Sequence, residues 1–303
     1  MIKKKLIVIV GPTAVGKTPL AIELAKELGT EIISADSRQI FRELEIGTTK
    51  PTKEELAQVR HHFINIKSIT EEYNAALFGK EARDAIDMLF ETKGIAVMCG
   101  GSGLYVKAAL EGFDQIPTIE VGIRDKINQE FEEKGLAWLQ GQVQEIDPDY
   151  FSVVDTKNPQ RLIRALEVSY SSGKPFSSWR NKQVTSLPFQ VMKIGLELPR
   201  EELYHRIDKR MDEMIEKGLF EEAEKFYPQR QLNSLQTVGY QEIFGFLDGL
   251  YDKEESIRLL KRNSRNYAKR QMTWFKKDKE INWCRPDEMI QNLKILDSKW
   301  ISL

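Results

Sequence analysis

Short apolar runs along the chain predict strands, and helical periodicity predicts the segments between them. Residues 6–10 are apolar throughout and rich in β-branched side chains, which is typical of a strand covered on both faces. Residues 31–34 and 95–99 predict two further strands. Apolar positions repeat with a helical period in residues 19–28 and 77–90. This alternation predicts an α/β protein in which helices cover both faces of a parallel sheet.

The pattern changes after Gly112. Residues 114–186 contain polar, helical segments with few strand signals, whereas residues 190–198 predict another strand. The remainder is predicted to be mostly helical, over residues 200–217, 219–227, 237–248 and 254–277. We therefore expect a core of residues 1–113 and 187–303, with a helical C-terminal region, interrupted by an inserted helical lobe of residues 114–186.

A phosphate-binding motif follows the first predicted strand. Its residues fit the pattern G-x-x-x-x-G-K-[ST] at every position: Gly11, Pro12, Thr13, Ala14, Val15, Gly16, Lys17 and Thr18. A strand precedes the motif and a helix follows it, which is the context that the motif requires. Backbone amides and the helix dipole would attract an oxyanion, Lys17 would add a positive charge, and Thr18 could ligate Mg²⁺. The expected fold is therefore a P-loop NTPase-like sheet.

The carboxylate that a nucleotide hydrolase places at the end of a buried strand is missing here. The third predicted strand ends in Cys99-Gly100-Gly101, and the nearest acidic candidate is Asp36, after the second strand. Asp36 could act as a base on an acceptor, lie near a bound magnesium ion, or only cap a turn. The residues alone leave these alternatives open.

Composition excludes several other classes of protein. The net charge is −1, so a nucleic-acid surface would have to be local. The two cysteines and three histidines have no zinc-ligand spacing, and no run is long enough for a membrane span. We expect a cytoplasmic monomer without a structural metal. We interpret His61-His62 as part of a partly buried turn.

Seven ordered blocks between residues 5 and 285 resemble the tRNA dimethylallyltransferase family, also called tRNA isopentenyltransferases. The blocks are Gly11–Thr18 with Leu20-Ala21, residues 34–41, residues 46–51, residues 100–105, residues 158–167, Val238-Gly239-Tyr240 and residues 268–274. The resemblance implies transfer of a dimethylallyl group from dimethylallyl diphosphate to an adenine amino group. That adenine lies 3′ of the anticodon in tRNAs that read U-initial codons, and Mg²⁺ assists. ATP is not the implied substrate.

The resemblance also implies roles for individual residues. Asp36 matches the family's base and Arg210 its diphosphate-contacting arginine, although Arg210 alone would be interpreted as a solvent-exposed helix charge. Lys17 and Thr18 complete the implied catalytic set. Contacts to the anticodon stem-loop of tRNA are implied for Asp36, Ser37, Arg38, Gln39, Ser102, Arg124, Gln160, Arg161, Leu162, Ile163, Arg164, Gln236, Thr237, Val238, Gly239, Tyr240 and Gln241.

A local basic segment agrees with RNA binding. Residues 256–279 contain nine Lys/Arg and one acid, Asp278, which gives a local charge of 9 − 1 = +8. Lys269 and Arg270 are our candidates for phosphate contact. Tyr267, Trp274 and Phe275 interleave with the cations, and either contact RNA or form the core face of the helix.

Three positions depart from the family pattern, and three other functions compete. Val15 replaces a usual serine, Phe41 replaces a usual tyrosine, and Ser102 replaces a usual threonine but keeps the hydroxyl. A small-molecule P-loop kinase, an adenylate isopentenyltransferase and a non-catalytic RNA-binding module are the alternatives. The first two do not need the basic segment, and the third leaves the phosphate loop and Asp36 unexplained.

Overall fold

The structure is a computed structural model that describes residues 4–112, 116–117, 119–180 and 187–288 of the 303-residue chain. The chain divides into two compact units. The core unit comprises residues 1–112 and 186–303, and the lobe comprises residues 113–185. Each unit is described by itself.

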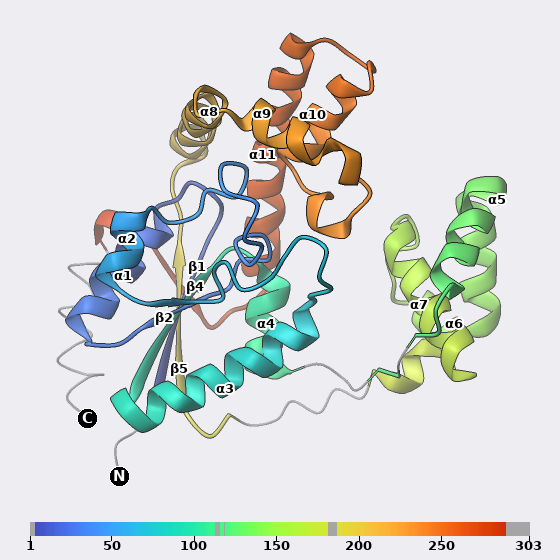
Figure 1. Ribbon diagram of the computed structural model, residues 1–303. Coiled ribbons are helices and arrows are strands. Elements are labelled where there is room, and N and C mark those ends of the chain that lie inside the picture. Colours follow the sequence, from blue (N-terminus) through green and yellow to red (C-terminus); the bar gives the residue numbers. More distant parts are fainter. Residues whose placement is uncertain (1–3, 113–115, 118, 181–186, 289–303) are drawn as a thin grey trace. The chain divides into compact units, whose positions relative to one another are not determined.

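The core unit is built on a parallel sheet of six strands, in the order β3-β2-β4-β1-β5-β6 (Figure 1). The strands are β1 (Lys5–Val10), β2 (Ile32–Ser34), β3 (His61–His62), β4 (Ile95–Gly100), β5 (Gln190–Leu196) and β6 (Ile281–Cys284). The predicted parallel sheet and its four predicted strands are confirmed. Because parallel strands end at the same edge of a sheet, the loops after β1, β2 and β4 meet there.

Two strands were missed by sequence analysis. The interpretation of His61-His62 as a turn was wrong, because these residues form β3 and pair with Ile32 and Ile33 of β2. β6 adds the opposite edge by pairing with β5. β3 consists of two histidines and β6 alternates without an apolar run, so neither shows the pattern that marked β2, and a neighbouring strand supplies the hydrogen bonds that define them.

Alternate side chains of β1 enter two cores on opposite faces of the sheet. Leu6, Val8 and Val10 pack with α3 (Ala75–Lys93) and α4 (Gly103–Glu111), whereas Ile7 and Ile9 pack with α1 (Lys17–Glu27). All five side chains are at most 2% exposed. Full burial of an aliphatic side chain contributes about 1.5–3 kcal/mol. β1 therefore holds the phosphate loop that follows it in a fixed position.

Local signals explain where several helices begin and end. Asn74 caps α3 by accepting hydrogen bonds from the amides of Ala76 and Leu77, and Gly94 ends it at φ 71°. α2 (Lys53–Gln58) was not predicted, although Thr52 and Glu55 form a capping box at its start. The helix is short and contributes no buried side chain, so it lacks a hydrophobic period.

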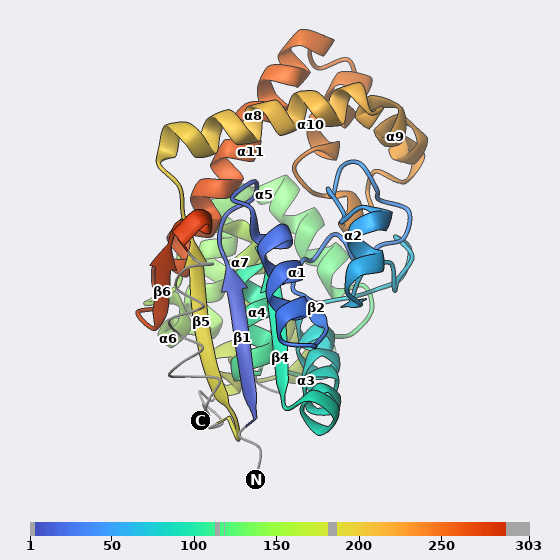
Figure 2. The same ribbon diagram turned by 90° about the vertical axis from the view of Figure 1, so that its left-hand side faces the viewer.

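Helices of the C-terminal region lie beyond the carboxyl ends of the strands, and the last of them returns to the sheet (Figure 2). They are α8 (Arg200–Glu216), α9 (Leu219–Phe226), α10 (Tyr240–Leu247) and α11 (Lys253–Phe275), which confirms the four predicted helices. Leu260 of α11 packs in their shared core, whereas Ala268 and Phe275 pack in the two cores of the sheet. α11 therefore connects all three cores of this unit.

The lobe has a core of its own. It contains α5 (Ile123–Ile146), α6 (Pro148–Phe151) and α7 (Pro159–Ser172), and its described residues form no strand. Gly135 interrupts α5 with a non-helical backbone at φ 77°. In the part of the chain that the structure describes, no helix is both long and apolar enough to cross a membrane.

Candidate active site

The phosphate loop between β1 and α1 adopts a backbone that glycine permits. Gly11 has φ 150° and Gly16 has φ 102°. A Cβ at Gly11 would lie 2.7 Å from the carbonyl oxygen of Leu196, so a larger residue would displace the loop from β5. Val15, at the position of a usual serine, is fully buried in the core with α1. Its departure from the family pattern therefore has a packing role.

Lys17 already points into this loop. Its Nζ donates hydrogen bonds to the carbonyl oxygens of Gly11, at 3.0 Å, and Pro12, at 2.7 Å. Burial lowers the pKa of Lys17 to about 8, and the nearby side chains of Cys99 and Asp36 oppose this shift. An anion in the loop would favour the protonated form, so Lys17 is suited to hold a negatively charged group.

Arg210 reaches the same loop from α8. Its Nη2 donates a hydrogen bond to the hydroxyl of Thr13. Burial lowers the pKa of the guanidinium, and the charge of Asp36 opposes that shift. The interpretation of Arg210 as a solvent-exposed helix charge, which the residue alone favours, was wrong. Sequence spacing could not place α8 over a loop that lies almost 200 positions away.

Asp36 lies in the turn after β2. Its Oδ1 accepts hydrogen bonds from the amides of Arg38, at 2.9 Å, and Gln39, at 3.3 Å. Among the described residues, its Oδ2 has no hydrogen-bond partner. One oxygen therefore caps the turn, and the other remains available to accept a proton. The structural and the chemical interpretation of Asp36 are compatible.

The loops after β2 and β4 are in close contact. A Cβ at Gly100 would lie 2.1 Å from the carbonyl oxygen of Ala35, so only glycine fits there. The hydroxyl of Ser102 accepts a hydrogen bond from the amide of Ser37 at 3.0 Å. Ser102 thus holds Ser37, the residue next to Asp36. The bond is made by the hydroxyl group, which the usual threonine also carries.

Arg38 connects this turn to the segment before α10. Its guanidinium donates to the carbonyl oxygens of Asn233, Ser234 and Gln236, at 2.9, 3.1 and 3.3 Å. These bonds bring residues 36–39 next to residues 236–241, two segments that the resemblance assigns to tRNA. In this arrangement the Arg38 side chain binds protein backbone.

A carboxylate that sequence analysis missed organises the neighbouring loop. Glu222 of α9 accepts hydrogen bonds from the amides of Glu45, Ile46 and Gly47 and from the hydroxyl of Tyr240. A Cβ at Gly47 would lie 2.6 Å from the Tyr240 ring. Tyr240 is fully buried, whereas Gln236 and Gln241 on either side of it are exposed. In the sequence, the only indication of this contact was that residues 46–51 and Val238-Gly239-Tyr240 are both among the seven blocks.

α11 presents different residues to the core and to solvent. Lys269 and Arg270 are exposed, Phe275 is buried in the core, and Trp274 is 39% exposed. Four of the nine basic residues of this segment form ion pairs with acidic side chains: Arg258 with Glu255, Lys261 with Asp212, Arg265 with Asp208 and Lys276 with Glu197. The positive surface is therefore smaller than the count of +8 suggests.

In the lobe, α7 buries part of the predicted RNA-contacting segment. Leu162 and Ile163 are at most 1% exposed and belong to the lobe core, so their side chains cannot reach a ligand. Gln160 and Arg161 are exposed. Arg124 of α5 donates to Gln160 and pairs with Glu167, which also pairs with Arg164. Arg124, Gln160 and Arg164 are thus linked to one another around the buried carboxylate of Glu167.

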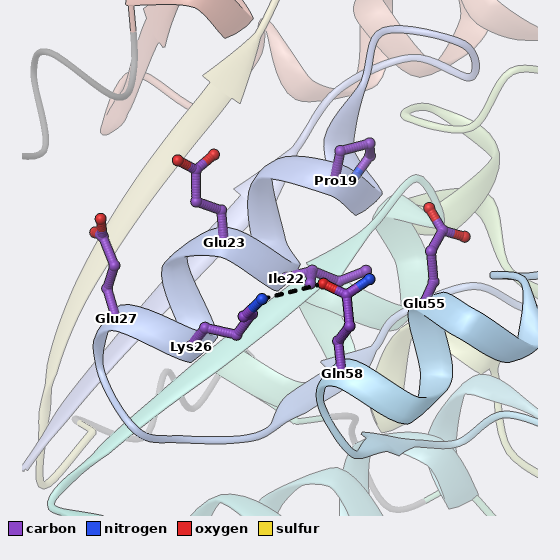
Figure 3. A pocket seen from close by; sticks show the side chains of 7 residues that line it. All are labelled: Pro19, Ile22, Glu23, Lys26, Glu27, Glu55 and Gln58. Carbon is purple, nitrogen blue, oxygen red and sulfur yellow. Dashed lines mark hydrogen bonds between the residues drawn. The ribbon is translucent and has the colours of Figure 1, made fainter.

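A hollow of about 320 Å³ lies behind the phosphate loop, between α1 and α2 (Figure 3). Glu23, Glu27 and Glu55 line it, and its only cation, Lys26, donates a hydrogen bond to Gln58. This acidic surface repels a diphosphate. We therefore place the candidate site at the carboxyl ends of β1, β2 and β4 instead.

Comparison with known proteins agrees with this geometry. Residues 39–278 match the family model described as IPP transferase. A tRNA dimethylallyltransferase from Cytophaga hutchinsonii is 52% identical over 298 residues, which cover 98% of each chain. Another from Christiangramia forsetii is 50% identical over 288 residues, or 95% of each chain.

Two solved structures have the same fold. A full-length tRNA isopentenylpyrophosphate transferase from Bacillus halodurans has 37% identity and a TM-score of 0.72, and the match covers 98% of this chain and 96% of that one. A eukaryotic dimethylallyltransferase, described as acting on tRNA, has 27% identity and a TM-score of 0.75 over 99% and 77% of the two chains. The phosphate loop, its lysine and the neighbouring aspartate thus lie in a chain that belongs to the tRNA dimethylallyltransferase family.

Proposed function

We propose that this protein transfers a dimethylallyl group from dimethylallyl diphosphate to the exocyclic amino group of an adenine in tRNA. The adenine is the one 3′ of the anticodon in tRNAs that read U-initial codons, and the protein acts as a cytoplasmic monomer. One observation carries the proposal. Lys17 and Arg210 both donate hydrogen bonds to the phosphate loop. Burial lowers the pKa of each, and the charge of the same carboxylate, Asp36, opposes both shifts.

The proposed reaction balances with these residues. The amino nitrogen attacks C1 of the dimethylallyl group, and the bond from C1 to the diphosphate oxygen breaks with its electron pair on the diphosphate. Lys17, Arg210 and the loop amides stabilise the charge that grows on this leaving group. The amino group loses one proton as the new C–N bond forms, and Oδ2 of Asp36 accepts it.

The residues present fit a magnesium ion bound with the diphosphate. Mg²⁺ keeps several waters and takes few protein ligands when phosphate oxygens are available. The hydroxyl of Thr18 has no hydrogen-bond partner in the described chain and would bind the ion. When bound, the ion would neutralise part of the diphosphate charge.

Surface residues of both units support a tRNA acceptor. In the core unit, Lys269 and Arg270 would contact phosphates, and Gln236 and Gln241 are exposed beside the turn that contains Asp36. In the lobe, the proposed contacts are the side chains of Gln160, Arg161, Arg164 and Arg124. An adenine must leave its stack before its amino group can reach a carboxylate in this turn.

Labelled dimethylallyl diphosphate tests the proposal when it is supplied with tRNA, with AMP, or with a tRNA whose target adenine is replaced by guanine. We expect label only in unmodified tRNA, and nucleoside analysis should place it on the adenine 3′ of the anticodon. Label in AMP but not in tRNA would identify an adenylate isopentenyltransferase instead.

A further inference from the structure

Gln271 is a buried polar side chain of α11 that is hydrogen-bonded to two loops of the candidate site. It is 7% exposed, and its amide makes two hydrogen bonds to backbone groups. Its Oε1 accepts from the amide of Thr13 at 2.8 Å, and its Nε2 donates to the carbonyl oxygen of Gly101 at 2.9 Å. A side-chain amide is suited to this position because it carries an acceptor and a donor on separate atoms.

The two partners of Gln271 belong to different halves of the site. Thr13 lies in the phosphate loop, and its hydroxyl accepts the hydrogen bond from Arg210. Gly101 directly precedes Ser102, which holds the amide of Ser37 next to Asp36. A Cβ at Gly101 would lie 2.3 Å from Nε2 of Gln271, so the close approach requires glycine.

The same face of α11 makes a second connection one turn earlier. Burial raises the pKa of Tyr267 to about 12, and a hydrogen bond with Ser102 opposes that shift. Residues four positions apart lie on one face of a helix. The inward face of α11 therefore touches the phosphate loop and the loop after β4, while Lys269 and Arg270 face solvent.

We propose that Gln271 is a positioning residue that sets the spacing between the phosphate loop and the loop that orients Asp36. The inference rests on the proposed function, because that function makes the phosphate loop the diphosphate grip and Asp36 the proton acceptor. The bond from Thr13 to Gln271 also limits which backbone amides of the phosphate loop can bind the diphosphate. The amide of Thr13 is bonded to Gln271 and is not offered to the diphosphate, whose oxygens meet the later amides of the loop and the Lys17 ammonium.

Gln271→Met tests the proposal, because methionine preserves the length of the side chain and removes both hydrogen bonds. Two measurements are made: calorimetric affinity for inorganic pyrophosphate with Mg²⁺, and single-turnover transfer to tRNA. We expect pyrophosphate to bind about tenfold more weakly and transfer to slow about 100-fold, because small displacements of reacting groups have large effects on rate. Thr273→Ala, on the exposed side of the same helix, should change neither value.

Gln271→Glu separates positioning from general loss of structure. A protonated carboxyl both accepts and donates, as the amide does, whereas a carboxylate only accepts. The affinity of this variant for pyrophosphate, divided by that of the wild type at the same pH, should therefore rise at least threefold from pH 8 to pH 5.5. A ratio that stays constant over this range would overturn the proposal, even if Gln271→Met is inactive because it unfolds.

The same experiment distinguishes the inference from the proposed function. If the wild type fails to bind pyrophosphate, the diphosphate grip is wrong and the inference falls with it. If the wild type binds pyrophosphate and transfers the prenyl group, but Gln271→Met does both equally well, only the role of Gln271 is overturned.

Discussion

The core unit and the lobe both carry residues assigned to tRNA, but they hold these residues in different ways. In the core unit, Arg38 ties the turn Asp36–Gln39 to the segment Gln236–Gln241, which leads into α10, and Glu222 supports this segment by accepting a hydrogen bond from Tyr240. In the lobe, Gln160–Arg164 is the first turn of a regular helix, and two of its five residues are buried. The core therefore holds its candidate residues through backbone contacts, whereas the lobe offers an exposed, polar face. Substitutions should affect chemistry in the first unit, and binding or lobe stability in the second.

Asp36→Ala tests the chemical half of this comparison and has the largest expected effect. Removal of a general base costs up to about 10⁴-fold in rate, so single-turnover transfer should fall by about 10³-fold or more. Affinity for tRNA, measured by filter binding, should stay within about threefold. Asp84→Ala, on the exposed surface of α3, is the matched control. Near-normal turnover of Asp36→Ala would show that the base lies elsewhere.

Leu162→Ala tests the interpretation of the lobe. This side chain is fully buried, so its truncation should destabilise the protein by about 2–5 kcal/mol in urea unfolding. Arg161→Ala, at the exposed neighbouring position, should leave stability within about 0.5 kcal/mol and weaken tRNA binding several-fold. The assignment of Leu162 to the lobe core and Arg161 to its surface would be wrong if Leu162→Ala left stability unchanged and Arg161→Ala lowered it.

The pKa of Lys17 predicts how diphosphate affinity depends on pH. In the free protein Lys17 is protonated below about pH 8, and the anion favours that form. Affinity for pyrophosphate should therefore be highest below this value and fall above it, by up to about tenfold per pH unit. The measured quantity is the affinity of the wild type divided by that of Lys17→Met, which cancels the titration of pyrophosphate itself. A ratio independent of pH would contradict the role of the ammonium.

Replacement of Lys269 and Arg270 by alanine has the smallest expected effect. Each cation that contacts a phosphate contributes about one unit to the slope of log affinity against log salt, so the slope should decrease by about two. Turnover at saturating tRNA should remain unchanged. Lys261 and Arg265, which pair with acids of α8, are a matched pair on the same helix, and their replacement should alter the slope less. Equal slopes in both double variants would remove the outward face of α11 from the interface.

Much of the fold could be predicted because it rests on local signals. Apolar runs marked β1, β2, β4 and β5, and the helical period marked the long helices, since each pattern is repeated over several turns or residues. β3 is a pair of histidines, β6 includes the polar Asn282, and α2 has no buried side chain, so none of them shows an apolar run or a helical period. Their existence depends on neighbours: β2 and β5 supply the pairing, and Thr52 with Glu55 supplies the cap.

The candidate site divides in the same way. The phosphate loop is a contiguous motif, so Gly11, Lys17 and Thr18 could be named as candidates from the sequence, and the structure places them between the end of β1 and the first turn of α1. Arg38, Glu222 and Gln271 act on partners more than 150 positions away, and no spacing along the chain reports such bonds. A residue such as Arg38 was therefore predicted to contact RNA, while its guanidinium binds the backbone of a distant loop.

By itself, the sequence determined the parallel sheet, the phosphate loop after its first strand and the family to which the chain belongs, because hydrophobic periodicity and contiguous motifs are properties of neighbouring residues. Only the tertiary structure decided that Arg210 meets Thr13, that Leu162 and Ile163 are buried, and that α11 joins the two halves of the site through Gln271. These outcomes depend on which helix packs against which loop, and packing is settled by the whole chain at once.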